Sequence, residues 1–132
     1  GQGLNYTDNR YTYHRPPAAA DNAPLAMYSH RWSTAPWWQV PPLDAQATAG
    51  RYLPGRDVQV FRREFSREEM RRNTAGVEHW LRMGPQLFDL AGDWPQARNL
   101  AGSPLEREYA AKLKAAMEKA HAPQEQFQRL GL

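Results

Sequence analysis

Two stretches in the second half of the chain repeat apolar residues at helical spacing. In the first, the apolar stripe consists of Met70, Thr74, Val77, Trp80 and Leu81. Ser66 and Glu69 have the spacing of a capping box in front of this stripe. Gly84 and Pro85 follow it, and both residues are typical of a helix end. The pattern predicts a helix at about 67–83.

The second stretch predicts a helix at about 104–121. Its apolar face has four-residue spacing and consists of Leu105, Tyr109, Leu113 and Met117. Ser103 and Glu106 form a second capping box, and Pro123 stops the helix. Residues 124–132 are expected to add one further turn around Phe127.

The segments before and between these helices carry weaker signals. Residues 57–61 alternate polar and apolar side chains and predict one short strand, for which the sequence offers no clear partner. Residues 85–102 form a connector, in which Leu87 and its apolar neighbours are expected to make one helical turn. Asp93 is placed to cap a second short turn of this connector, which is expected to end near Gly102.

Residues 1–56 lack such periodicity and predict coil with turns. Seven of the eleven prolines precede residue 57. The aromatic residues of this segment are Tyr6, Tyr11, Tyr13, Tyr28, Trp32, Trp37, Trp38 and Tyr52. A disordered segment is usually poor in aromatic residues and rich in charge, whereas this one has the opposite composition. We therefore expect it to become ordered in an extended form against a partner surface.

Together these elements predict a mainly α, helical protein with extensive irregular structure. We expect two regions: an extended, partner-draping segment at 1–56 and a small helical region at 57–132 that holds the two amphipathic helices. Two helices of this size are marginally stable alone. Part of their apolar surface is therefore expected to be covered by the N-terminal segment or by another protein.

The charge is mildly basic, with a formal net charge of +3 and an isoelectric point of about 9.4. The strongest basic cluster consists of Arg62, Arg63, Arg67, Arg71, Arg72 and Arg82. Glutamates interrupt this cluster, so it is not the continuous basic stripe that is typical of nucleic-acid-binding proteins. A peripheral ribosomal or other RNA-binding subunit therefore stays open as a less favoured alternative.

The sequence carries none of the motifs of phosphate-binding loops, dinucleotide-binding folds or nucleophile elbows. The histidines are His14, His30, His79 and His121, and none lies three or four residues from another. Most carboxylates fall beside arginines on predicted exposed helix faces, where solvated ion pairs are the default. We therefore predict a non-enzymatic protein without catalytic residues, cofactor or metal.

The predicted function is that of a non-catalytic structural or accessory subunit of a large multi-protein assembly. No apolar run reaches the roughly 18 residues of a transmembrane helix, so we expect no membrane span. Aromatic anchors and arginine fasteners are expected to contact neighbouring subunits through Arg10, Tyr11, Tyr13, Arg15, Arg31, Trp32, Trp37 and Trp38.

In composition alone, the chain is similar to the accessory subunits of mitochondrial respiratory complexes. This similarity favours an organellar location, with the mitochondrion as the first choice. The small proteins that line ciliary microtubules have a similar composition, so a ciliary or cytoplasmic location is the alternative. A regulatory module that folds alone and binds one soluble partner is a further possibility.

Overall fold

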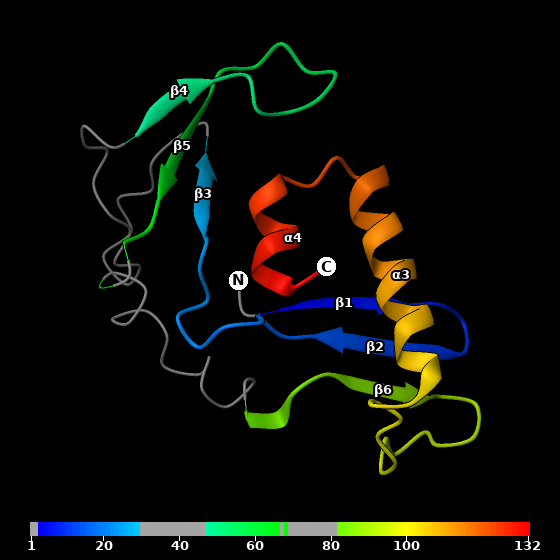
Figure 1. Ribbon diagram of the computed structural model, residues 1–132. Helices are drawn as coiled ribbons and strands as arrows, with labels where there is room; N and C mark the ends of the chain where they lie inside the picture. The colour runs from blue at the N-terminus through cyan, green and yellow to red at the C-terminus, as the bar shows by residue number, and fades with distance from the viewer. Residues whose placement is uncertain (1–2, 30–46, 67, 69–81) are drawn as a thin grey trace.

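The computed structural model describes residues 3–29, 47–66, 68 and 82–132. These residues form six strands and two helices, which make a mixed α/β fold (Figure 1). The elements are β1 Leu4–Thr7, β2 Tyr11–Arg15, β3 Ala26–Ser29, β4 Thr48–Gly50, β5 Val60–Glu64, β6 Gln86–Asp89, α3 Pro104–Lys119 and α4 Gln124–Leu130. The prediction of a mainly α, helical protein is therefore wrong, because much of the segment predicted to be irregular pairs into sheets.

β1 and β2 form an antiparallel hairpin, in which Thr7 pairs with Thr12 next to the turn. Asp8 builds this turn, because its Oδ1 accepts the backbone N–H of Arg10 at 3.0 Å and that of Tyr11 at 2.8 Å. The coil predicted for this part of the chain is wrong. Along β2, alternate side chains point to opposite faces, which is the period-two pattern of a strand.

β6 completes the first sheet by pairing antiparallel with β2, which gives the strand order β1-β2-β6. The register places Leu87 opposite Tyr13, and both side chains are 0% exposed. The helical turn predicted around Leu87 is therefore wrong, because this residue lies in a strand that contributes to the core. Strands from both sides of residue 56 lie in this one sheet.

The second sheet has the order β3-β5-β4, with β5 paired antiparallel to both neighbours. β5 overlaps the strand predicted at 57–61 but begins three residues later, at Val60. Its partners come from the segment that was predicted to be coil. The strand without an evident partner in the sequence is thus the central strand of a sheet.

α3 confirms the helix predicted at 104–121, and α4 confirms the further turn around Phe127. The buried residues of α3 are Tyr109, Leu113 and Met117. The capping box is only partly formed. Ser103 occupies the N-cap without a side-chain hydrogen bond, and Glu106 Oε2 instead accepts the N–H of Gly102 at 2.6 Å. The helix predicted at 67–83 lies almost entirely outside the described residues.

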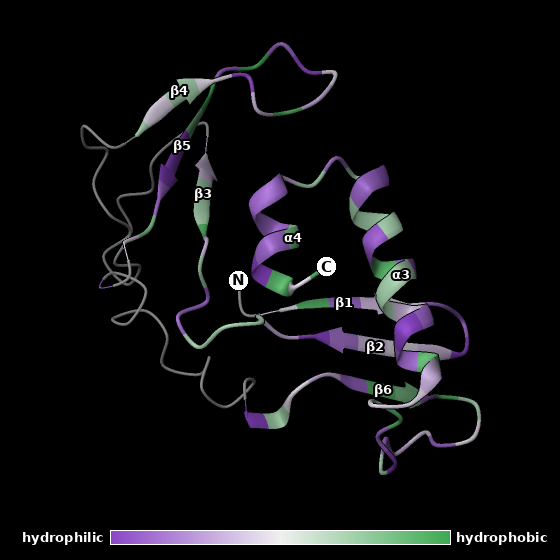
Figure 2. Ribbon diagram, viewed as in Figure 1, coloured by the Kyte–Doolittle hydropathy of each residue, from purple (hydrophilic) through white to green (hydrophobic). Residues whose placement is uncertain are grey.

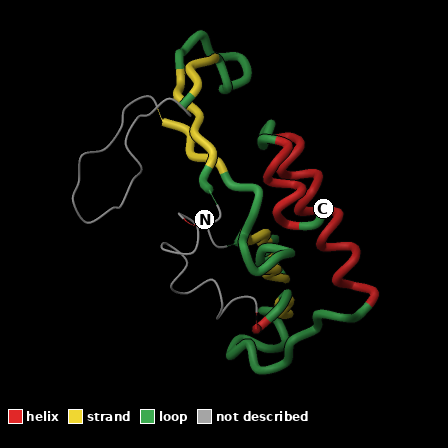
Figure 3. Tube along the Cα trace, turned by 60° about the vertical axis from the view of Figure 1, so that its left-hand side comes forward, coloured by secondary structure: helices red, strands yellow, loops and turns green. Residues whose placement is uncertain are grey.

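α3 and α4 lie side by side over one face of the first sheet (Figures 1 and 3). The core between them consists of Tyr13, Leu87, Tyr109, Leu113, Met117, Phe127 and Leu130. Figure 2 shows the hydrophobic segments on β6 and along α3 that contribute to this layer. Arg15 joins β2 to the end of α4, because its Nε donates to the Leu130 carbonyl at 2.9 Å and its Nη2 to the Gly131 carbonyl at 3.1 Å.

The second sheet is joined to α4 by a smaller polar contact. The Tyr28 hydroxyl on β3 donates to the Glu125 carboxylate on α4. Arg62 Nε on β5 donates to the same hydroxyl oxygen at 3.0 Å, and its Nη2 lies 3.6 Å from Glu125 Oε1. Arg63 is also only 4% exposed. Two arginines of the predicted basic cluster, Arg62 and Arg63, are therefore used within the fold.

Candidate protein-binding surface

The loop of residues 90–103, between β6 and α3, carries the most exposed large hydrophobic side chain of the described residues. Trp94 in this loop is 79% exposed, whereas Leu53, the next most exposed, is 47% exposed. Figure 1 shows the loop beside β6 and the start of α3, at the lower right. Indole burial is strongly favourable, so a tryptophan held in water is an informative feature.

Asp93 fixes the backbone on both sides of Trp94. Its carbonyl accepts the N–H of Gln96 at 2.9 Å. Its carboxylate accepts the N–H of Ala97 at 3.0 Å through Oδ1 and that of Arg98 at 2.8 Å through Oδ2. A turn forms after Asp93, but the predicted cap of a turn that ends near Gly102 is wrong, because the turn closes at Gln96 and the carboxylate accepts the N–H groups four and five residues on. Asp93 holds residues 93–98 around its side chain while the neighbouring indole is exposed.

Asp89, the last residue of β6, holds the first part of the loop. Its carboxylate accepts the N–H of Ala91 at 3.1 Å, and its carbonyl accepts the N–H of Asp93 at 2.7 Å. Arg10 Nη2 donates to Asp89 Oδ2 at 3.0 Å, and this guanidinium holds the pKa of the Asp89 carboxyl below its usual value. Arg10 of the β1–β2 turn thereby holds the start of the loop in place.

Asn99 holds the last part of the loop against β6. Its Oδ1 accepts the N–H of Leu87 at 2.9 Å and that of Ala101 at 3.0 Å, and its Nδ2 donates to the Pro85 carbonyl at 3.1 Å. Leu100 adds a backbone bond to the Leu87 carbonyl at 2.8 Å. Asn99 and Leu100 thus occupy the outer edge of β6 in place of a further strand. Both ends of the Trp94 loop are therefore fixed before any partner binds.

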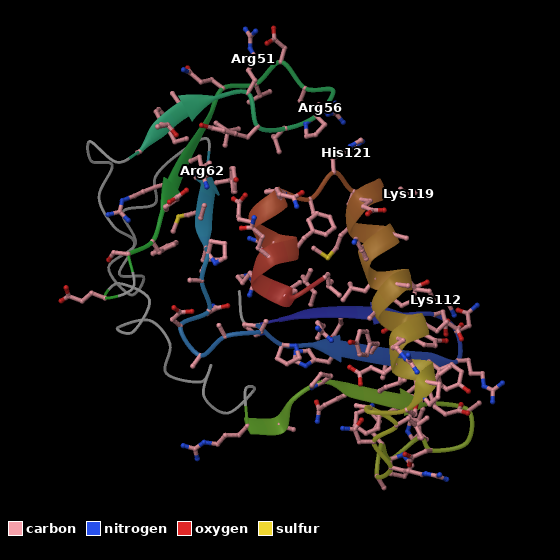
Figure 4. All side chains as sticks on the ribbon, in the orientation of Figure 1. Arg51, Arg56, Arg62, Lys112, Lys119 and His121 are labelled. Carbon is pink, nitrogen blue, oxygen red and sulfur yellow. The ribbon has the colours of Figure 1, made fainter. Side chains whose placement is uncertain are left out.

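A second group of polar side chains joins the β1–β2 turn to α3. The Tyr109 hydroxyl donates to Asp8 Oδ2 at 2.7 Å. Lys112 Nζ lies 3.6 Å from the same oxygen and 4.1 Å from the Tyr109 ring centroid. Figure 4 shows Lys112 on the half of α3 nearer the hairpin, whereas Lys119 and His121 lie at the other end.

The charge states of this group are fixed at neutral pH. The backbone N–H of Tyr11 and the hydroxyl of Tyr109 lower the pKa of Asp8 to about 2. Burial and the hydrogen bond to Asp8 raise the pKa of Tyr109 to about 12. Since a general acid or base works best with a pKa near the working pH, this arrangement favours a structural contact between hairpin and helix.

Four of the eight predicted partner-contacting residues are described, and the fold uses them internally. Tyr13 is buried, its hydroxyl donates to Glu106 Oε1 at 3.3 Å, and Arg15 Nη1 donates to the Tyr13 oxygen at 3.2 Å. Arg10 keeps a side chain that is 64% exposed, and its guanidinium carbon lies 4.9 Å from the ring centroid of Tyr11. The predicted residues outside the described part are Arg31, Trp32, Trp37 and Trp38.

The described part of the chain lacks both a metal-binding cluster and a membrane-spanning helix. Residues 3–29, 47–66, 68 and 82–132 hold no group of three His, Asp or Glu side chains that is placed to bind a metal ion. No helix in these same ranges is both long and apolar enough to cross a bilayer. A groove at the α3–α4 junction is lined partly by polar side chains, including Lys114, Glu118 and Gln124. The Trp94 loop therefore offers the clearest binding chemistry.

Sequence reasoning placed the anchors in the first 56 residues and did not single out Trp94. A signal was present in the tripeptide Asp93-Trp94-Pro95, because Pro95 excludes a helix interior or a central strand at this position and Asp93 favours a turn. Comparisons of the chain with protein-family models, curated proteins and solved structures give no match.

Proposed function

We propose that this protein is a non-catalytic structural subunit of a multi-protein assembly and that Trp94 is its principal docking residue. The observation that carries the proposal is a 79% exposed tryptophan on a loop whose backbone is held by Asp89, Asp93 and Asn99. Tryptophan is among the residues most enriched at the energetic centres of protein interfaces.

The physical chemistry of the loop suits docking in two ways. Full burial of an indole removes roughly 200 Å² of surface from water, which corresponds to about 5 kcal/mol of favourable transfer free energy. Ordering a flexible loop on binding would cost part of this gain, but the hydrogen bonds of Asp93 and Asn99 already hold the loop in one conformation. The ordering of the loop therefore takes little from the burial energy when a partner binds.

The predicted draping contacts of Trp32, Trp37 and Trp38 stay part of the proposal, because these residues lie outside the described part of the chain. For residues 4–29 we propose no draping contacts, because Tyr13 lies in the core and Arg15 binds the end of α4. The mitochondrial location, and the ciliary or ribosomal alternatives, stay predictions from composition. Fractionation of source cells that express the tagged full chain tests them.

The deciding experiment compares Trp94→Ala with Leu53→Ala in the tagged full chain, expressed in source cells and purified under native conditions. Leu53 is the matched control, because it is also an exposed apolar side chain but lies on the β4–β5 loop. We expect Trp94→Ala to reduce the recovery of co-purifying subunits about tenfold or more, and Leu53→Ala to leave it unchanged. Wild-type protein recovered only as a monomer, or equal recovery with both variants, contradicts the proposal.

A further inference from the structure

The hydrogen-bonding groups around Trp94 differ in whether the fold already uses them. The acceptors are used: Asp89 accepts bonds from Arg10 and Ala91, and Asp93 accepts two backbone N–H groups. The donors are available, because the exposed Arg98 side chain makes no ion pair or hydrogen bond with the other described residues. The surface therefore offers N–H groups to a partner while its carboxylates are engaged.

The available guanidinium and the exposed indole belong to the same turn. Trp94 follows Asp93 directly, and the backbone N–H of Arg98 lies 2.8 Å from Asp93 Oδ2. One carboxylate therefore fixes the chain positions from which both side chains emerge. Both side chains are exposed, so one partner surface can contact them together.

We propose that the partner at this surface is a protein that receives the Trp94 indole in an apolar pocket and places a carboxylate at the rim of that pocket against Arg98. This inference rests on the proposed function and adds the chemistry of the partner. An Arg–carboxylate pair forms two parallel N–H···O bonds, which gives directional specificity that apolar burial lacks. Trp and Arg are also the two residue types that dominate interface hot spots together with Tyr.

The surroundings of Trp94 favour a protein over a nucleic acid. A stacking tryptophan beside an arginine is also found in single-strand-binding proteins, where a basic groove follows the phosphates. Here Asp89 and Asp93 lie within five residues of the indole and carry negative charge. The loop of residues 90–103 holds one basic side chain, Arg98, so it lacks the run of cations that follows a phosphate backbone, whereas one guanidinium suffices to bind one partner carboxylate.

The first test measures how charge at position 98 affects assembly. The full chain is purified under native conditions from source cells as wild type, Arg98→Glu and Arg98→Lys, over a series of salt concentrations. We expect Arg98→Glu to reduce the co-purifying subunits about tenfold, because two carboxylates then face each other, and Arg98→Lys to retain most of them. Retention by Arg98→Glu equal to that of wild type overturns the inference.

The second test identifies the partner group. Arg98→Lys places an amine where a zero-length carbodiimide reagent joins it to a carboxylate in contact, and mass spectrometry then locates the bond. We expect a link from position 98 to an Asp or Glu of one partner subunit. Lys119 is an internal control, because it is exposed but lies at the far end of α3 (Figure 4). An intact assembly without a cross-link at position 98 contradicts the inference that a partner carboxylate contacts Arg98.

The outcomes separate this inference from the proposed function. Loss of assembly with Trp94→Ala but not with Arg98→Glu overturns the rim carboxylate and leaves Trp94 docking in place. Full assembly with Trp94→Ala overturns both. Binding of a labelled single-stranded RNA to the purified full chain, followed by fluorescence anisotropy and lost with Trp94→Ala, identifies a nucleic-acid partner and also overturns the inference.

Discussion

Replacing Asn99 with alanine removes the side chain that closes the outer edge of β6 and holds the end of the Trp94 loop. Three hydrogen bonds are lost at once, to the N–H of Leu87, the N–H of Ala101 and the carbonyl of Pro85. Their costs differ because their environments differ. Leu87 is 0% exposed, so water has poor access to its N–H, whereas Ala101 and Pro85 are only partly buried.

The expected loss of stability follows from this difference. A buried donor left without an acceptor costs about 1–3 kcal/mol, whereas groups that water reaches contribute little. We therefore expect Asn99→Ala to lower the free energy of unfolding by about 2 kcal/mol. For a chain of this size, roughly 4 °C per kcal/mol gives a fall of about 8 °C in Tm. Asn99→Asp keeps both acceptor bonds and loses only the donor, so its loss is expected to be less than half as large.

The assay is urea and thermal unfolding of the full chain, followed by circular dichroism. Arg98→Ala is the control in the same loop and is expected to change stability by less than about 0.5 kcal/mol, because its side chain is exposed. Asn99→Ala is also expected to reduce assembly although Trp94 is unchanged, since the loop is no longer preorganised. The assigned role of Asn99 is wrong if Asn99→Ala unfolds like wild type, or if Asn99→Asp loses as much stability as Asn99→Ala.

Two further predictions concern the hairpin contact and the core. The Asp8 carboxyl is expected to titrate with a pKa of about 2, below the ordinary 3.8, in an NMR titration. Because the pKa of Asp8 is lowered in the folded state, its stabilising effect is present above about pH 4 and is lost as the pH falls through about 2. Asp8→Asn should abolish this pH dependence. An Asp8 carboxyl that titrates with its ordinary pKa contradicts the prediction. Leu130 is 0% exposed, so Leu130→Ala is expected to lower the free energy of unfolding in urea by about 2–5 kcal/mol. Val58 is 45% exposed, so Val58→Ala should lower it by less than about 0.5 kcal/mol. Equal losses with the two variants contradict the assigned core.

The helices of the described part were predictable because their signals are local. The apolar face of α3 repeats every four residues, and proline marks its start, so the whole element is encoded within about twenty positions. The sheets were not predictable in the same way. β2 is five residues long and its partner β6 lies more than seventy residues further along the chain, so neither strand is specified by its own neighbourhood.

The candidate site shows the same limit at the level of single residues. Tyr13 and Trp94 are both large aromatic residues, yet one is 0% and the other 79% exposed. Sequence reasoning treated Tyr13 as a partner anchor because it lies in a segment rich in proline and aromatic residues. Its burial depends on β6 and α3, which come from distant parts of the chain. Aromatic content predicts that a surface will be buried, but tertiary pairing decides which aromatic residue remains outside.

The bonds from Arg15 to the carbonyls of Leu130 and Gly131 also constrain the order in which the molecule forms during synthesis. Arg15 is separated from these two partners by 115 and 116 positions in the sequence, so its native bonds form only when the two ends of the described chain meet. The β1–β2 hairpin is translated before α3 and α4, so its inner face stays uncovered until both helices have been made. Tyr13 therefore stays exposed to water until the helices are present, and its burial is a late, long-range step in the formation of the core.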